Sequence, residues 1–406
     1  MEPSPSPPLR FIGLDIHKDY AVACGVNAAQ EPVLGPQRVG NAQLAQWAAK
    51  HLSHQDAIVI EMTTNTWEVY DLLRPLVHSV TVVHPPHVAL IVRAQVKTDR
   101  KAALALAQLH AAGLLVGIWV PPPEVRDLRM LISQRRKMVC LATTAKNRLH
   151  AALHRHHLAA PPSSLPFSPK HEAFWLSLPV SPSECAIIHC DWQTVTFADQ
   201  QKKALEEAIA QAIADDPRAP LLVQLPGIGL ISAATLLAAI GDIDRFPDAK
   251  HLVGYAGLGA RVHDSGHTHR GGRITKAGRK DIRWTMVEAA RHAARSHAYW
   301  KGQFARLEPR LGKSKTYVAI ARRLLVAVWH VLSKETADRF ADAQQVACAF
   351  FAHAYKIGVR NLPDGLSALA YTRQELDRLG LGAHLTSIPW GSKRFKLPPS
   401  SLVPRT

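Results

Sequence analysis

The chain has 406 residues, of which 47% are hydrophobic, and these values are typical of a globular protein with two or three domains. The formal net charge of +17 favours a polyanionic partner. The sequence has no apolar segment of transmembrane length and no signal peptide, so nucleic acid is favoured over a membrane surface. Five scattered cysteines suit a reducing cytoplasm, and residues 1–10 are predicted to form a disordered arm.

Residues 11–122 alternate between strand-like and helix-like segments, which is typical of an α/β domain. Asn41 and Thr98 stand where they would cap two of the helices. The layout resembles the ribonuclease H-like fold, in which the last acid of the active site lies on a helix. The expected helices begin near residues 41, 66 and 99, and the expected strands are 11–16, 19–26, 33–39, 57–62 and 79–84.

Three carboxylates stand where such a domain would use them. Asp15 and Glu61 end or interrupt apolar strands, and Asp99 begins a helix. A carboxylate in an apolar run is costly to bury unless it is paired or binds a metal. Together the three acids would hold Mg²⁺, which prefers oxygen ligands and phosphate substrates. The plainer alternative is that Asp15 ends a strand and Asp99 lies in the first turn of a helix.

Residues 123–216 are predicted to form a basic helical region. Apolar residues recur at near-heptad spacing, which favours helix pairing in a coiled coil; they are Leu128, Leu131, Met138, Leu141, Ala145 and Leu149. A long face of one sign repels itself, so contact with a phosphate backbone explains it better than solvation alone. Residues 158–184 are rich in Pro and Ser and are predicted to be a linker. The cations expected to bind nucleic acid are Arg126, Arg129, Arg135, Arg136, Lys137, Lys146 and Arg148.

The segment 225–240 carries two glycines in a tight turn before a helix of small residues. This pattern predicts a helix-hairpin-helix, whose exposed N–H groups at Gly227 and Gly229 would bind a DNA phosphate without reading sequence. The alternative is an ordinary glycine turn between two helices.

A second basic segment, 263–284, surrounds Ser265 and Gly266. A serine hydroxyl is a weak nucleophile unless a base or cation activates it, and dense positive charge would stabilise a phosphorane-like transition state. Read from its residues alone, the segment is a nucleic-acid-binding loop in which Ser265 is one hydrogen-bond donor. The cations expected to bind are Arg270, Arg273, Lys276, Arg279 and Lys280.

Taken together, these motifs resemble the transposases of the insertion sequence 110 family, which are bridge-RNA-guided recombinases. The resemblance covers roughly residues 10–333 and rests on GLDIHK, VIEMT, KTDRKAALALA, LPGIG, the Ser-Gly pair in a basic loop, ITKAGRKDIR and GKSKTYVAIARRLLVAVWHVL. It implies a RuvC-like DEDD domain over 11–122, a coiled-coil middle over 123–216 and a mainly α transposase domain with a catalytic serine over 217–334. It also implies a bacterial, nucleoid-associated protein that works as a homodimer assembling to a homotetramer.

By the resemblance, Asp15, Glu61 and Asp99 match the first three acids of the metal site and Ser265 matches the nucleophile. A bridge RNA would pair with target and donor DNA while the protein recognises its shape. The family has a fourth acid three residues after the third, and here that position is Ala102. One alternative is that the chain is an inactivated form, engineered or natural. The other is that three acids are enough for catalysis. The substitution at Ala102 favours inactivation.

Two other functions remain open. One is a Holliday-junction resolvase-like nuclease in which water attacks the phosphodiester, and the other is a non-enzymatic nucleic-acid-binding protein, which Ala102 favours. Residues 335–406 form a C-terminal extension to which the sequence assigns no chemistry.

Overall fold

The computed structural model describes the backbone of residues 7–91, 98–265 and 268–402, and the side chains of these except 90, 91, 262–265 and 268–271. The chain forms two compact units, residues 1–121 and 122–406. Of the predicted N-terminal arm, residues 1–6 lie outside the described part.

The first unit is built on a five-stranded sheet in the order β3-β2-β1-β4-β5. β1 pairs antiparallel with β2, β2 pairs antiparallel with β3, and β4 and β5 run parallel to β1. The sequence predicted all five strands. Their bounds are Arg10–Ile16 for β1, Tyr20–Asn27 for β2, Pro32–Gly40 for β3, Asp56–Glu61 for β4 and Ser79–Val83 for β5.

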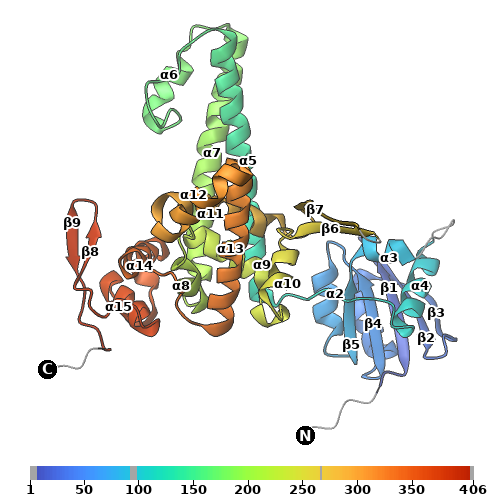
Figure 1. The fold of residues 1–406 in the computed structure, drawn as a ribbon. Helices are drawn as coiled ribbons and strands as arrows, with labels where there is room; N and C mark the ends of the chain where they lie inside the picture. The colour runs from blue at the N-terminus through green and yellow to red at the C-terminus, as the bar shows by residue number, and fades with distance from the viewer. Residues whose placement is uncertain (1–6, 92–97, 266–267, 403–406) are drawn as a thin grey trace. The chain divides into compact units, whose positions relative to one another are not determined.

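Helices cover both faces of this sheet, and Figure 1 shows α2 and α4 on opposite sides of it. One face buries Ile12, Leu14 and Ile58 against Trp47 and Leu73 of the helices that follow β3 and β4. The opposite face lies under α4 and α3. The helices are α1 (Leu44–His51), α2 (Thr66–Leu73), α3 (Pro85–Ile91) and α4 (Asp99–Ala111).

A mixed sheet with helices on both faces agrees with the predicted α/β class and with a DEDD nuclease-like fold. The central strands are hydrophobic on both faces because both are covered, as Ile12, Val59 and Ile60 at 0% exposure show.

The second unit begins with a long antiparallel pair of helices, α5 (Pro123–Arg155) and α7 (Pro182–Ala212), which lie side by side in Figure 1. The predicted pairing of a long helix is therefore made within one chain. The segment expected to be a linker, 158–184, does not behave as one. It carries α6 (Glu172–Leu176) and packs Trp175, at 0% exposure, against Leu149, Leu153 and Trp192 at the end of the pair.

The sequence did not reveal this packing because its Pro and Ser residues are typical of mobile segments, while the burial of Trp175 depends on both long helices. The predicted heptad also departs from the observed one, because Leu141 is 38% exposed and Ala142 is buried instead.

A helical body follows, with one hydrophobic core. Leu324, Leu325 and Val328 of α13 are fully buried in it. Contrary to the expectation from the sequence, α13 is long and apolar enough to cross a membrane by length and composition alone. The burial of these three residues is that of a core helix. The elements are α8 (Arg218–Val223), α9 (Leu230–Ile240), α10 (Ala249–Tyr255), β6 (Ala260–Ser265), β7 (Thr268–Ile274), α11 (Lys280–Ser296), α12 (Ala298–Leu311) and α13 (Lys313–Lys334).

The C-terminal extension shares that core through Phe350, Phe351 and Leu376. Its elements are α14 (Ala343–Ile357), α15 (Ala368–Arg378), β8 (Ser387–Trp390) and β9 (Lys393–Lys396). The extension is therefore an integral part of the second unit.

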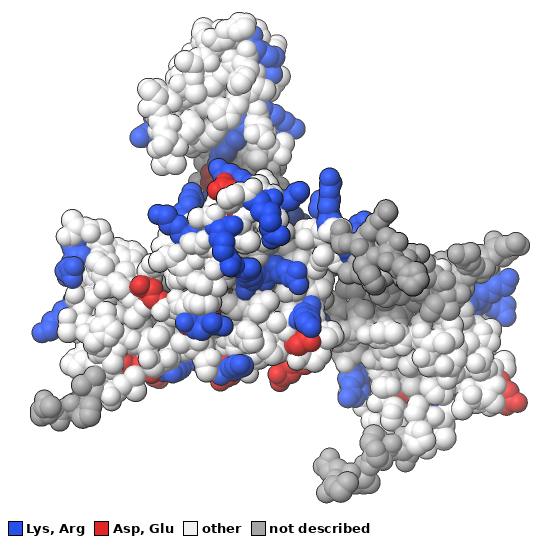
Figure 2. Space-filling model, viewed as in Figure 1, with Lys and Arg blue, Asp and Glu red and all other residues white. Residues whose placement is uncertain are grey.

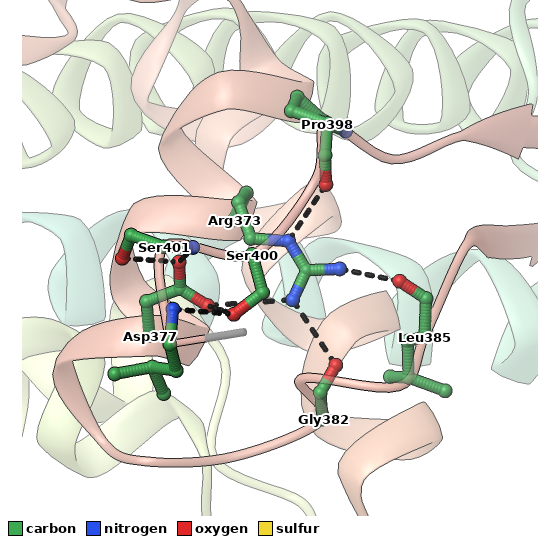
Figure 3. Close-up of polar contacts among 8 residues, drawn as sticks. Arg373, Asp377, Gly382, Leu385, Pro398, Ser400 and Ser401 are labelled. Carbon is green, nitrogen blue, oxygen red and sulfur yellow. Dashed lines mark hydrogen bonds and ion pairs between the residues drawn. The ribbon is translucent and has the colours of Figure 1, made fainter. Parts of the chain in front are cut away.

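Arg373 on α15 holds the end of the chain in place, as Figure 3 shows. Its guanidinium, with a side chain 5% exposed, donates hydrogen bonds to the carbonyls of Gly382, Leu385 and Pro398. A buried charge is tolerated when its hydrogen-bond donors have acceptors, and here most of the acceptors are backbone carbonyls. Nearby, Asp377 accepts hydrogen bonds from the Ser400 and Ser401 hydroxyls and from the Ser401 N–H.

Candidate active site

The acidic site of the first unit lies at the carboxyl ends of β1 and β4. These parallel neighbours are in register up to Leu14 and Ile60, so the next positions along both strands are Asp15 and Glu61. Side chains alternate between the faces of a sheet, which puts both acids on the face of Gly13. That face is covered by α4.

Gly13 lets α4 approach closely enough to bring the third acid to this edge. A Cβ at Gly13 would lie 2.1 Å from the carbonyl oxygen of Ala103 and 2.8 Å from the backbone nitrogen of Ala107. The helix begins where predicted, because the Thr98 hydroxyl accepts a hydrogen bond from the Lys101 N–H. Asp99 lies one turn before Ala103, and so it projects toward the end of β1.

Two of the predicted acids converge with a histidine that sequence reasoning missed. Oxygens of Asp15 and Asp99 and a ring nitrogen of His17 all lie within 4.8 Å of one another. His17 Nε2 is 3.4 Å from Asp15 Oδ2 and 3.5 Å from Asp99 Oδ2. The carboxylate of Glu61 does not belong to this set among the described residues, although its strand position adjoins that of Asp15.

A tyrosine and an arginine complete the surroundings of Asp99. The Tyr20 hydroxyl donates a 2.9 Å hydrogen bond to Asp99 Oδ2, and this bond raises the pKa of the Tyr20 phenol above its usual range. The Arg38 guanidinium lies 3.7 Å from the centre of the Tyr20 ring. Arg38, Thr98, Asp99 and Arg100 line an open hollow of about 610 Å³, which carries positive charge beside the acids.

The donor set fits a divalent cation. His17 Nε2 is buried and makes no hydrogen bond with any residue that the structure describes, although two carboxylate oxygens lie near it. A buried polar atom without a partner requires an explanation, and a metal ion shared by the imidazole and the two acids would supply one. The signal in the sequence was His17 two residues after Asp15, in GLDIHK.

Ala102 is half-buried on α4, three residues after Asp99. Residues at this spacing share a helix face, so a carboxylate at position 102 would approach the same edge as Asp99. No cluster of metal ligands in the described ranges includes a fourth acid.

Ser265 is the last residue of β6 in the second unit. The hairpin pairs Ala260 with Ile274 and Ser265 with Thr268, so the serine stands at its tip. The side chains of Ser265 and Arg270 lie outside the described residues.

The other cations of this segment differ in their contacts. Arg273, Lys276 and Lys280 are exposed. Arg279 forms an ion pair with Asp281. Burial acts to raise the pKa of the Asp281 carboxyl, but the contact with Arg279 holds that pKa below its usual range.

The predicted basic face of α5 is partly compensated by α7. Arg135 pairs with Glu206, Lys146 with Asp199 and Arg148 with Asp191, so acids distant in sequence offset three of the expected cations. The sequence could not show this, because the acids lie on another helix. Arg136 and Lys137 are exposed and stay candidates for phosphate contact.

Two further predicted cations of α5 have contacts of other kinds. Arg129 donates a 2.7 Å hydrogen bond to the Ala238 carbonyl at the end of α9, and burial lowers its pKa to about 10. It therefore fastens two helices together. Arg126 is half-buried.

The glycine turn before α9 contains the two glycines of the predicted hairpin. Gly227 has φ +83°, and a Cβ there would lie 2.5 Å from the Ala289 carbonyl oxygen, so close packing on α11 requires glycine. Gly229 is the N-cap residue of α9 and offers no side-chain cap, and Lys356 lies close to it. The N–H groups at this helix start are of the type that binds phosphate.

An acidic cluster at the edge of a mixed sheet is compatible with a DEDD-type transposase. Two family models agree with this class: a DEDD transposase model matches residues 12–158, and the model of the "Transposase IS116/IS110/IS902 family" matches residues 219–305. The chain belongs to the IS110 family of transposases.

Individual relatives support the same assignment. The chain is similar to the transposase for insertion sequence element IS1111A of Coxiella burnetii, with 24% identity over 82% of this chain and 92% of that protein. It is 29% identical to the pilin gene-inverting protein of Moraxella bovis, over 79% of this chain and 95% of the relative. A Sinorhizobium fredii protein named as a transposase is 30% identical over 61% of this chain, but the match spans only 58% of that relative.

Proposed function

We propose that the protein is an RNA-guided DNA recombinase of a mobile element, in which the DEDD-type centre and Ser265 act on one phosphodiester. The observation that carries the proposal is the convergence of Asp15, His17 and Asp99 at the end of β1. A bridge RNA that pairs with target and donor DNA is supported by the family resemblance and by the net charge of +17. We place the protein in the bacterial cytoplasm, associated with the nucleoid and acting as a tetramer built from dimers.

The chemistry of the proposed reaction conserves phosphodiester bonds. Ser265 Oγ forms a bond to phosphorus while the bond to one deoxyribose oxygen breaks; the serine proton leaves, and the released deoxyribose oxygen takes one up. Attack by the hydroxyl of the exchanged strand on the phosphoserine then reverses the step, so no external energy source is needed. The exposed Arg273 and Lys276 would offset the charge that develops on the phosphate.

The acidic centre would hold Mg²⁺ through Asp15 and Asp99, with Glu61 at the adjoining strand end and His17 as a nitrogen donor. When bound, the ion would supply Lewis-acid stabilisation of phosphate oxygens. Tyr20 keeps the Asp99 carboxylate oriented through its hydrogen bond.

Restoring the fourth acid tests the proposal. We expect Ala102→Asp, expressed together with the DNA that flanks its gene, to raise strand cleavage by about 100-fold or more, the size of effect that one charge-stabilising group has at an active site. Ala111→Asp, at a half-buried position near the far end of α4 and on another face of the helix, serves as the matched control. Equal activity of Ala102→Asp and the parent chain would show that three acids suffice or that position 102 lies outside the site.

Ser265→Ala, added to the Ala102→Asp chain, should abolish cleavage. A stalled reaction of the Ala102→Asp chain should yield DNA covalently attached to the peptide that contains Ser265, detected by mass spectrometry. Full cleavage by Ser265→Ala would favour the resolvase-like nuclease, with water as the nucleophile. Silencing transcription of the flanking DNA should abolish recombination, and unchanged recombination would contradict RNA guidance.

A further inference from the structure

A large open groove of about 1330 Å³ lies in the second unit between the β6–β7 hairpin and the helices α12 and α13. We call it the hairpin groove. Figure 2 shows Lys and Arg side chains gathered over the helices α11–α13, with few acids among them. The cations that line the groove are Arg273, Lys276, Arg310, Lys315, Arg322 and Arg323.

Among the residues that the structure describes, no acid compensates the charge of the hairpin groove. All six cations are exposed, and no Asp or Glu is among its described lining residues. None of the six takes part in an ion pair within the described part of the chain, in contrast to Arg135, Lys146 and Arg148 on α5. Six like charges around one hollow repel each other, so a polyanion is the occupant that lowers their energy.

The floor of the hairpin groove is apolar, with Leu307, Leu311 and Val318 among its residues. A cationic rim over an apolar floor suits a nucleic-acid strand, whose phosphates contact the rim while sugars and bases lie against the floor. An acidic peptide would meet the rim but would not need so wide a hollow.

Lys276 is held in a conformation that lysine rarely adopts. Its φ is +56°, and it lies between two tightly packed glycines, Gly257 at φ +66° and Gly278 at φ +108°. The Lys276 N–H donates a 3.1 Å hydrogen bond to the Gly257 carbonyl, which fixes this turn. Left-handed conformations of residues other than glycine are energetically unfavourable and concentrate at ligand-binding sites. This turn therefore holds the backbone of Lys276 in a fixed place in the lining of the hairpin groove.

We infer that the hairpin groove binds the DNA strand that flanks the cleaved phosphodiester. This rests on the proposed role of Ser265 for the choice of DNA over RNA. Ala260 and Ile274 line the groove and pair across the hairpin, and Ser265 lies five residues beyond Ala260 on the same strand. At about 3.4 Å per residue this is about 17 Å, or roughly five base steps along B-form DNA. DNA lying in the groove would thus be within a few nucleotides of the serine.

Binding of a labelled DNA duplex by the full chain, measured over a range of salt concentrations, tests the inference. In Arg310→Gln/Arg322→Gln the log–log slope should become shallower by about 1.8, because each lost phosphate contact removes about 0.9. Lys393→Gln/Lys396→Gln, which removes two exposed cations from β9, should leave the slope unchanged. An unchanged slope in the groove variant, with a melting temperature equal to that of the parent, would overturn the inference.

A second measurement does not depend on loss of affinity. Ser314 is exposed and lines the groove, so DNA should slow the reaction of Ser314→Cys with a maleimide by at least tenfold. The exposed Cys190 on α7 provides the comparison within the same chain. Equal protection of Ser314→Cys by an RNA of the same sequence, or none by DNA, would contradict the assignment. Neither measurement requires catalysis, so an inactive Ser265 would leave the groove assignment standing.

Discussion

At the residue scale, the acidic centre differs from the predicted one in its members. Asp15 and Asp99 lie close together as expected, and His17 Nε2 lies 3.4 Å and 3.5 Å from their Oδ2 atoms. The cluster that could hold a metal ion therefore offers a nitrogen donor beside the carboxylate oxygens. Imidazole suits first-row transition metals better than it suits Mg²⁺, and Mn²⁺ also accepts the carboxylate oxygens that Mg²⁺ prefers.

The role of His17 leads to a prediction about metal binding. Mn²⁺ bound to the full chain should show nitrogen coupling in electron spin-echo spectra, and His17→Gln should abolish this coupling and weaken Mn²⁺ binding by about tenfold or more. Asp19→Asn, two residues away and exposed, is the control and should change neither. Coupling that survives in His17→Gln would assign the nitrogen to another residue.

At the element scale, the C-terminal extension carries a buried group that links its stability to pH. His353 on α14 is 2% exposed, and neither ring nitrogen makes a hydrogen bond within the described residues. Burial lowers the pKa of His353 to about 4. The imidazole is therefore neutral in the folded protein at pH values where the unfolded chain binds a proton.

The sign of the pH dependence follows from that difference. Between about pH 6.5 and pH 4 the unfolded state binds more protons, so the free energy of unfolding should fall as the pH falls, by up to about 3 kcal/mol. His353→Leu should flatten this part of the profile in chemical denaturation, and the exposed His384→Gln should leave it as in the parent. Parallel profiles for His353→Leu and the parent would show that His353 does not titrate in this way.

At the scale of the whole molecule, the two units have separate cores. One is built around Ile12, Leu14 and Ile58, and the other around Leu324, Leu325 and Phe350. Units with their own cores commonly unfold as separate cooperative transitions.

We therefore expect two transitions in calorimetry of the full chain. Ile58→Ala should lower the midpoint of one transition and Leu324→Ala that of the other, each by more than about 5 °C, because such changes cost roughly 2–5 kcal/mol. Each variant is the control for the other. A single transition that both variants shift equally would show that the units unfold together.

The sequence by itself determined the local features of this protein. These features depend on neighbours a few residues away. They are the five strands of the first unit, the Thr98 cap of α4 and the glycine turn before α9, and the structure has each of them where predicted. The positions of Asp15 and Asp99 at the end of a strand and the start of a helix were also predictable, since both follow from element boundaries.

Only the tertiary structure decided which residues meet. Acids of α7 pair with three cations of α5, Trp175 packs against the end of that helix pair, and His17 lies beside the two acids of the first unit. Each of these contacts joins side chains whose positions depend on how helices and strands pack, and no local pattern encodes that. The hairpin groove is the same kind of feature, because Arg273 and Arg322 come from elements about fifty residues apart and share one hollow only after folding.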